Sequence, residues 1–183
     1  MTRLAALTLS LAVLAGCAAR NDLDEPPVAL GNFALGLNIV VADNMQMVPI
    51  SRPATVEDWE AAMKKAVDDR FGRYAGSRLY NIGINIDAYA LAPPGVPIVL
   101  SPKSVVAISA NIWDDATQTR LNPEPVRLTV FESLSGSSFV GSGLSQSPAQ
   151  QMENLAYNAA KAVEDWLVQN PQWFPADPAQ APQ

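Results

Sequence analysis

The sequence predicts an α+β fold, a two-layer sandwich in the order β-α-β-β-β-α, with two helices on one face of a mostly antiparallel four-stranded sheet. Two segments, near 55–76 and 147–170, carry apolar residues at the three- and four-residue spacing of an amphipathic helix. Four shorter segments show the apolar runs or alternation of strands. Each helix presents one apolar stripe and each strand one apolar face, so a single two-layer domain buries them all.

The first predicted strand runs from Phe33 to Ala42. Its larger apolar side chains recur at every second position, while Gly36 and Asn38 fall between them. This alternation predicts a largely buried strand with one inward face, made of Phe33, Leu35, Leu37, Ile39 and Val41. Residues 43–54 follow as a loop that contains two prolines.

The first predicted helix begins after Thr55, a good N-cap residue, with Glu57 and Asp58 in its first turn. We expect it to end near Gly76. Its apolar stripe consists of Trp59, Ala62, Met63, Ala66, Val67, Phe71 and Tyr74.

Three strands are predicted in the middle of the chain, over 79–91, 105–113 and 126–131. In the first of them, alternate residues from Tyr80 to Ala88 form an apolar face, and the intervening residues from Asn81 to Tyr89 a polar one. The connections are short except around 93–97, where prolines interrupt the pattern. We therefore expect an antiparallel meander of these three strands.

The last helix carries a complete start signal, with Ser147 as N-cap, Pro148 at the first helical position and Gln150 completing a capping box. Its apolar stripe continues to Asn170, and Pro171 ends it. The final residues, 175–183, are Pro, Ala and Gln and are expected to be disordered. A single domain over 31–174 accounts for all predicted elements.

The N-terminus has the pattern of a bacterial secretory signal. Arg3 precedes an apolar run from Leu4 to Leu14, which is too short to span a bilayer. The run ends in Leu14-Ala-Gly-Cys17 and resembles the lipobox of bacterial lipoproteins, in which the cysteine is acylated and the peptide is cut before it. We therefore expect residues 1–16 to be removed, Cys17 to anchor the protein in a membrane, and residues 17–30 to form a tether.

The residues after Cys17 bear on localisation. Ala18 and Ala19 lack the Asp that retains lipoproteins at the inner membrane of enteric bacteria. The expected location is thus the periplasmic face of the outer membrane, with the inner membrane left open.

Composition narrows the function classes. The chain has no histidine and one cysteine, so the commonest general base and the commonest metal ligand are both missing. A net charge of −6 without basic clusters argues against nucleic acid. We expect no enzyme activity, no cofactor and no metal, and partners among envelope proteins.

Two candidate binding regions remain. Gly141, Ser142 and Gly143 precede the last helix and form either an anion-binding loop or a plain turn. Tyr89 and Trp113 fall on the polar faces of their strands with Asn85 and Asn111, which is typical of a recognition surface. Alternatively, the C-terminal segment with Trp173 and Phe174 covers that face.

The run Gly141-Ser-Gly-Leu144, with Gln151–Leu155 and Ala159–Leu167 after it, resembles uncharacterised lipoproteins of alphaproteobacteria. More distantly, it is similar to auxiliary lipoproteins of ABC lipid transporters and to CsgG/TolB-N-like α+β domains. This resemblance covers about residues 33–170 and implies the same α+β fold, with no catalytic residues to transfer.

The function that these observations predict is that of a non-enzymatic accessory or adaptor lipoprotein in envelope transport or assembly. The alternative is a module that binds a small ligand or lipid in a pocket between sheet and helices, with loops 43–54 and 93–103 as its rim.

Overall fold

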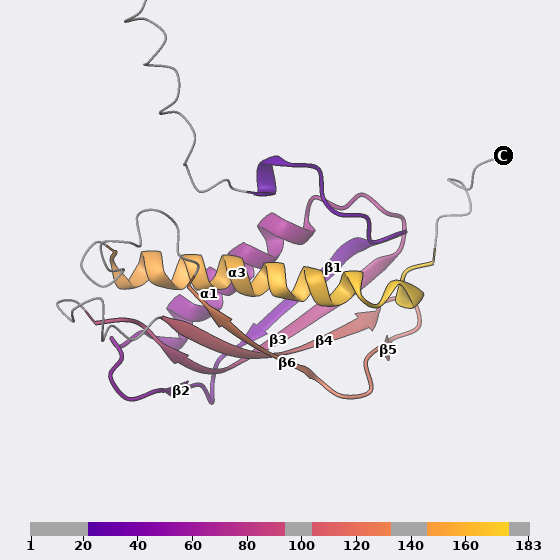
Figure 1. The fold of residues 1–183 in the computed structure, drawn as a ribbon. Coiled ribbons are helices and arrows are strands. Elements are labelled where there is room, and N and C mark those ends of the chain that lie inside the picture. Colours follow the sequence, from indigo (N-terminus) through magenta and orange to yellow (C-terminus); the bar gives the residue numbers. More distant parts are fainter. Residues whose placement is uncertain (1–21, 94–103, 133–145, 176–183) are drawn as a thin grey trace, which may run out of the picture.

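The computed structural model describes residues 22–93, 104–132 and 146–175. Two long helices, α1 (Val56–Phe71) and α3 (Pro148–Val168), lie side by side on one face of a mixed sheet, which confirms the predicted α+β class (Figure 1). Short 3₁₀ turns, η1 (Asp22–Asp24) and η3 (Pro171–Trp173), lie before and after this core.

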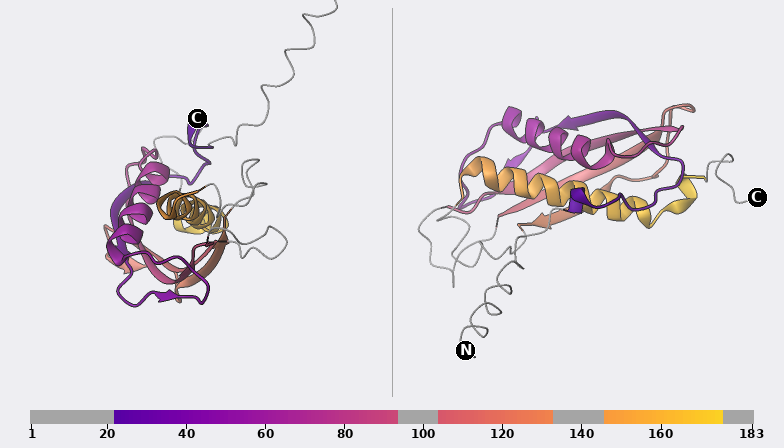
Figure 2. Two further views of the ribbon diagram at one scale, coloured as in Figure 1. Left: turned by 90° about the vertical axis from the view of Figure 1, so that its left-hand side faces the viewer. Right: turned by 90° about the horizontal axis from the view of Figure 1, so that it is seen from above.

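Four long strands form the body of the sheet: β1 (Ala34–Val41), β3 (Leu79–Ala90), β4 (Val105–Asp114) and β6 (Val126–Phe131). The strands β3, β4 and β6 pair antiparallel in sequence order, as predicted for the meander, and β1 pairs with β3 in parallel. Two strands of two residues, β2 (Gln46–Met47) beside β3 and β5 (Thr119–Arg120) beside β4, bring the sheet to six strands. Viewed end-on, the sheet curves around the helices (Figure 2).

The predicted caps are present at the helix starts. The Thr55 hydroxyl accepts a hydrogen bond from the Asp58 N–H at 3.1 Å, and Ser147 and Gln150 form the reciprocal capping box. Helix α1 ends at Phe71 with Gly72 as C-cap, earlier than expected, because glycine is a poor helix former even where the apolar stripe continues.

The core lies between the two layers, and side chains from both helices and all four long strands contribute to it. Its fully buried members include Trp59, Met63, Val67 and Phe71 from α1, Leu155, Ala159, Val163 and Leu167 from α3, and Ile84, Ile86, Ile108 and Ile112 from the sheet. The space between sheet and helices is filled with apolar side chains, which are the main stabilising contribution to such a domain.

Candidate interaction face

A β-bulge in the first strand reverses the predicted orientation of its second half. Leu35 pairs with Tyr80, but the next pair is Asn38 with Ile82, so Gly36 and Leu37 together face one residue of β3. After the bulge, Asn38 and Val40 point toward the helices, and the Val40 side chain is 3% exposed. The prediction of one buried face from Phe33 to Val41 was therefore wrong beyond Leu35, because the bulge shifts the alternation by one residue.

The consequence is a row of apolar side chains on the outer face of the sheet, the face turned away from the helices. Leu37, Ile39 and Val41 are 58%, 47% and 39% exposed. Ile39 and Val41 lie beside Gly83 and Asn85 of β3, which also face outward. We call these three residues the β1 row. Three adjacent exposed aliphatic side chains are typical of a surface that contacts a partner.

The bulge has an identifiable cause at Gly36. The Asn81 side chain, 8% exposed, reaches from β3 so that its Oδ1 accepts the Leu37 N–H at 2.7 Å. A Cβ on residue 36 would lie 2.4 Å from that oxygen, so only glycine leaves room for this contact. Asn81 thus satisfies the backbone N–H that the bulge removes from strand pairing.

Trp113 lies on the outer face, as expected. It is directly opposite Asn81 in the β3–β4 pair, and its ring packs over Gly83, where an added Cβ would approach the ring to 2.7 Å. The side chain is half-buried rather than covered. Trp113 therefore extends from β4 over β3 and supplies an aromatic surface next to Ile39 of the β1 row.

The polar residues predicted for this face are present on it and are bonded to one another. The Asn85 amide donates to Asp87 Oδ1 at 2.5 Å, and the Ser109 hydroxyl donates to Asp87 Oδ2 at 2.7 Å. Asn111 accepts a hydrogen bond from the Asn122 amide at 3.2 Å. These contacts hold the polar side chains beside Trp113 in fixed positions.

Tyr89 does not lie on this face, and its prediction was wrong. A second bulge, between Ile86 and Ala88, shifts the β3 alternation, so that Tyr89 pairs with the buried Val106. Tyr89 is 3% exposed, its ring is 5.4 Å from that of Trp59, and its hydroxyl accepts the Ala54 N–H at 3.0 Å. Tyr89 is a core residue with a satisfied hydroxyl.

The C-terminal aromatic residues pack elsewhere. Phe174 lies against Phe33 and Tyr80 in the core, at ring distances of 5.5 and 5.0 Å, and Trp173 packs edge-to-face on Trp166 of α3. In the described part of the chain, these residues leave the face with Trp113 uncovered. The far edge of the same sheet ends in Phe131, which is 57% exposed.

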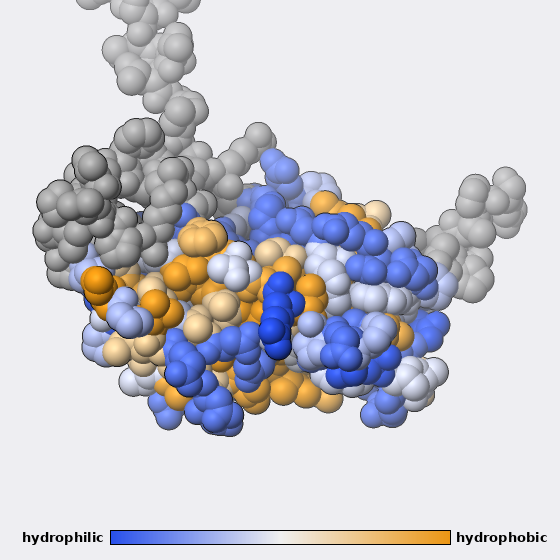
Figure 3. Space-filling view, turned by 60° about the horizontal axis from the view of Figure 1, so that its bottom comes forward, coloured by the Kyte–Doolittle hydropathy of each residue, from blue (hydrophilic) through white to orange (hydrophobic). Residues whose placement is uncertain are grey.

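Figure 3 turns the lower side of the molecule in Figure 1 toward the viewer. Hydrophobic surface runs across the middle of this side between hydrophilic groups. We call the outward-facing residues of the sheet, with the β1 row along one edge and Trp113 packed over β3 beside it, the outer sheet face.

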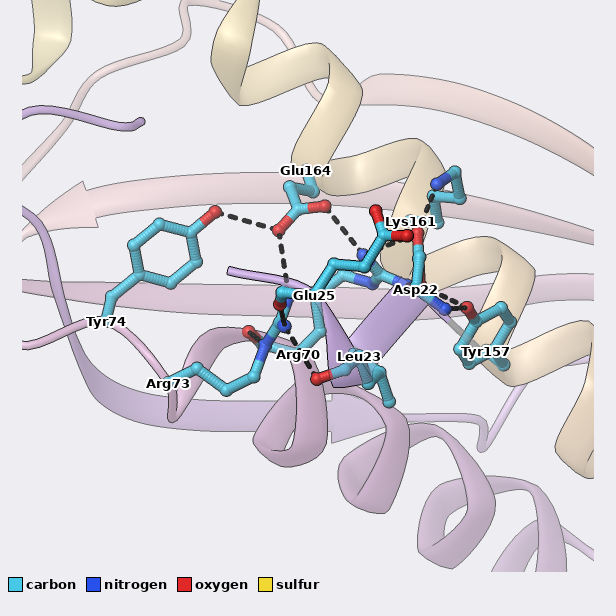
Figure 4. A network of polar contacts seen from close by, with 9 residues as sticks. All are labelled: Asp22, Leu23, Glu25, Arg70, Arg73, Tyr74, Tyr157, Lys161 and Glu164. Carbon is cyan, nitrogen blue, oxygen red and sulfur yellow. Dashed lines mark hydrogen bonds and ion pairs between the residues drawn. The ribbon is translucent and has the colours of Figure 1, made fainter. Parts of the chain in front are cut away.

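A buried polar network lies on the opposite side of the molecule, and sequence reasoning missed it (Figure 4). Arg70 of α1 is 1% exposed, and its Nη1 donates to Oε2 of Glu164 on α3 at 2.6 Å. The Tyr74 hydroxyl donates to the other Glu164 oxygen at 2.8 Å, and burial with this bond raises the pKa of Tyr74. Arg70 and Glu164 both lie on the apolar stripes of their helices. A charged residue at such a position is expected to be buried with a partner, so the sequence did contain a signal for this pair.

The N-terminal segment completes this network. Asp22 Oδ1 accepts from Arg70 Nη2 at 2.7 Å, and Tyr157 and Lys161 of α3 also contact the Asp22 carboxylate. Arg73 Nη1 donates to the backbone oxygens of Leu23 and Glu25 at 3.0 and 2.8 Å. Burial alone would raise the pKa of Asp22, but the hydrogen bonds from Arg70, Lys161 and Tyr157 outweigh it and lower that pKa.

The remaining predicted sites lie outside the described residues: Cys17 with the signal segment 1–16, the loop Gly141, Ser142 and Gly143, and most of the proposed rim 93–103 and of the tail 175–183. Across the three described ranges, no cluster of three or more His, Cys, Asp or Glu side chains is arranged to hold a metal ion. In those same ranges, no helix combines the length and apolarity needed to cross a bilayer.

No protein-family model matches the chain, and no similar sequence was found among curated proteins. Solved structures show a distant likeness. A candidate lipoprotein from Caulobacter crescentus is 10% identical, with 70% of this chain and 91% of that chain covered and a TM-score of 0.39. A Xanthomonas campestris protein of family DUF330 is 14% identical, with 80% of this chain and 94% of that chain covered and a TM-score of 0.40.

The PelC dodecamer from Paraburkholderia phytofirmans is 14% identical, over 73% of this chain and 92% of that chain, at a TM-score of 0.37. At such identities and TM-scores, function does not follow from the likeness.

Proposed function

We propose that this chain is a bacterial envelope lipoprotein without catalytic activity, which acts as an adaptor by binding a protein partner through its outer sheet face. The observation that carries the proposal is the β1 row, in which Leu37, Ile39 and Val41 are 39–58% exposed on a face that neither helix covers. Single exposed aliphatic residues are ordinary, but three in a row beside an aromatic ring are typical of an interface.

The anchor is proposed from the N-terminal sequence. The basic start, the short apolar run and Cys17 have the order of a lipoprotein signal, and two or more acyl chains hold a protein on a membrane stably. We place the protein on the periplasmic face of the outer membrane. Replacing Cys17 with Ser is expected to move the protein from the membrane fraction to the soluble fraction. Unchanged fractionation would contradict the anchor.

An adaptor is a better fit than a ligand carrier. A small ligand or lipid needs an enclosed space between the layers, whereas the described side chains there, such as Met63, Ile84 and Val163, are fully buried against one another. The exposed apolar surface is instead on the outside, where a protein partner has access to it.

The test compares two single substitutions in the full, acylated protein. Ile39→Ser changes the β1 row, and Val168→Ser is the matched control, because Val168 is similarly exposed, at 42%, but lies at the end of α3. After crosslinking in the native envelope and mass spectrometry, we expect Ile39→Ser to lose specific partners that wild type and Val168→Ser retain. The same partners on all three proteins would contradict the proposed face. Recovery of a stoichiometric lipid without protein partners would contradict the adaptor function.

A further inference from the structure

The contact between Asp22 and the helices connects the membrane anchor to one side of the domain. We call Asp22, Arg70, Tyr157 and Lys161 the Asp22 clamp. Its basic members come from both helices, Arg70 from α1 and Lys161 from α3, and the Arg70 guanidinium also lies 5.1 Å from the centre of the Tyr157 ring. Only Asp22 comes from outside the helices, and its carboxylate bonds charged side chains of both helices.

The Asp22 carboxylate balances a charge that the domain cannot leave unpaired. Arg70 is buried, and Glu164 bonds its Nη1, while Nη2 donates to Asp22. Without Asp22, that side of the buried guanidinium would lose its anionic partner. Arg73 adds two bonds to the backbone of residues 23 and 25, so the segment is held at several points.

The clamp shortens the connection to the bilayer. Asp22 is the fifth residue after Cys17, and this stretch spans at most about 18 Å when extended. If the segment were released, the next fixed point would be the buried Leu30, and the thirteen residues from Cys17 would span up to about 45 Å. The shorter connection keeps Asp22, and the side of the domain that bears it, within about 18 Å of the bilayer surface, whereas the longer one lets that side move more than twice as far away.

The position of the clamp then defines which side faces the membrane. In Figures 1 and 2, η1 lies against the helices, on the side away from the sheet. We propose that the Asp22 clamp holds the domain on the membrane with its helical layer toward the bilayer and its outer sheet face away from it. This inference rests on the proposed anchoring at Cys17, and it explains how an anchored protein keeps its apolar sheet face accessible to a partner.

The test measures how close each face lies to lipid. Acylated protein is reconstituted into vesicles of phosphatidylethanolamine and phosphatidylglycerol that contain a headgroup-linked quencher. The chain has one cysteine, which acylation consumes, so a fluorophore can be attached to a single new one: Glu153→Cys on α3 or Thr129→Cys on the outer sheet face, both exposed positions. We expect quenching to be several-fold stronger at position 153 than at 129.

Two variants separate the clamp from simple charge effects. Asp22→Ala is expected to bring quenching at the two positions close to equal. Asp24→Ala, the matched control, removes the same charge from an exposed position of the same 3₁₀ turn and should preserve the difference. Circular dichroism of Asp22→Ala verifies that the domain is still folded. If this variant is unfolded, Asp22→Asn, which keeps the shape of the side chain, replaces it in the quenching experiment.

The outcomes distinguish the clamp from the anchor. Equal quenching in the wild type would overturn the orientation. A difference that survives Asp22→Ala would overturn the clamp as the cause of the orientation, and both outcomes would leave the anchor intact. A mass spectrum without acyl chains and no vesicle association would overturn the proposed function, and the orientation with it.

Discussion

Replacing Gly36 with Ala tests the bulge that exposes the β1 row. The new Cβ would lie 2.4 Å from Asn81 Oδ1 and 3.3 Å from the Tyr80 carbonyl oxygen, both closer than the structure can accept without movement. The Asn81 side chain must then move away and lose its 2.7 Å bond from the Leu37 N–H. Leaving a partly buried donor without its partner, together with overpacking, predicts a loss of about 1–3 kcal/mol in the free energy of unfolding.

The assay is urea unfolding followed by tryptophan fluorescence and circular dichroism. In a thermal melt of a domain of this size, each kcal/mol of lost stability lowers Tm by about 2–4 °C. The decisive comparison is a double-mutant cycle with Asn81→Ala. In the absence of the Asn81 side chain, the new methyl group meets no amide oxygen, so Gly36→Ala should cost much less than in the wild type.

Additive effects of the two substitutions would refute this reasoning. They would mean that Asn81 does not occupy the space beside Gly36 and that the bulge has another cause. A stabilising effect of Gly36→Ala in the wild-type background would refute it as well, because the added methyl group would then fit without displacing anything.

The other predictions concern one core residue, one surface residue and the clamp. Tyr89→Ala is expected to cost about 3–5 kcal/mol in chemical unfolding, because the side chain is buried against Trp59; a stable variant that loses a partner would contradict this. Trp113→Ala should keep the fold, within about 1 kcal/mol of wild-type stability, and weaken partner crosslinking; a large drop in Tm would make Trp113 a core residue. Asp22→Asn should lower the free energy of unfolding by about 1–3 kcal/mol at neutral pH, because it removes an anionic partner of the buried Arg70. The loss stays in this range because the carboxyl is 27% exposed and its charge is partly screened. The pKa of Asp22 is lowered on folding, so its stabilising effect is complete above its unfolded pKa of about 4 and disappears only as the pH falls further; a difference from wild type that already vanishes between pH 7 and 5 would contradict the clamp.

The sequence by itself determined the order of the two long helices and four long strands and most of their bounds, but not the two-residue strands β2 and β5. Strand 126–131 and the start of α3 were predicted from signals a few residues long: alternation over one strand, and a Ser, Pro and Gln at fixed offsets. Such signals act through neighbouring backbone groups, so they are readable without knowledge of the rest of the fold. The α+β class followed because the apolar stripes and faces have few ways to be buried together.

Only the tertiary structure decided which side chains face outward. The bulges at Gly36 and Asp87 depend on a partner strand, and each reverses the faces of the residues that follow, which moved Ile39 outward and Tyr89 inward. The Asp22 clamp joins residues 48 to 139 positions apart, and no local pattern records such a pairing. Alternation in a sequence specifies two faces of a strand, but strand pairing determines which of them meets the core, since a one-residue shift in register exchanges them.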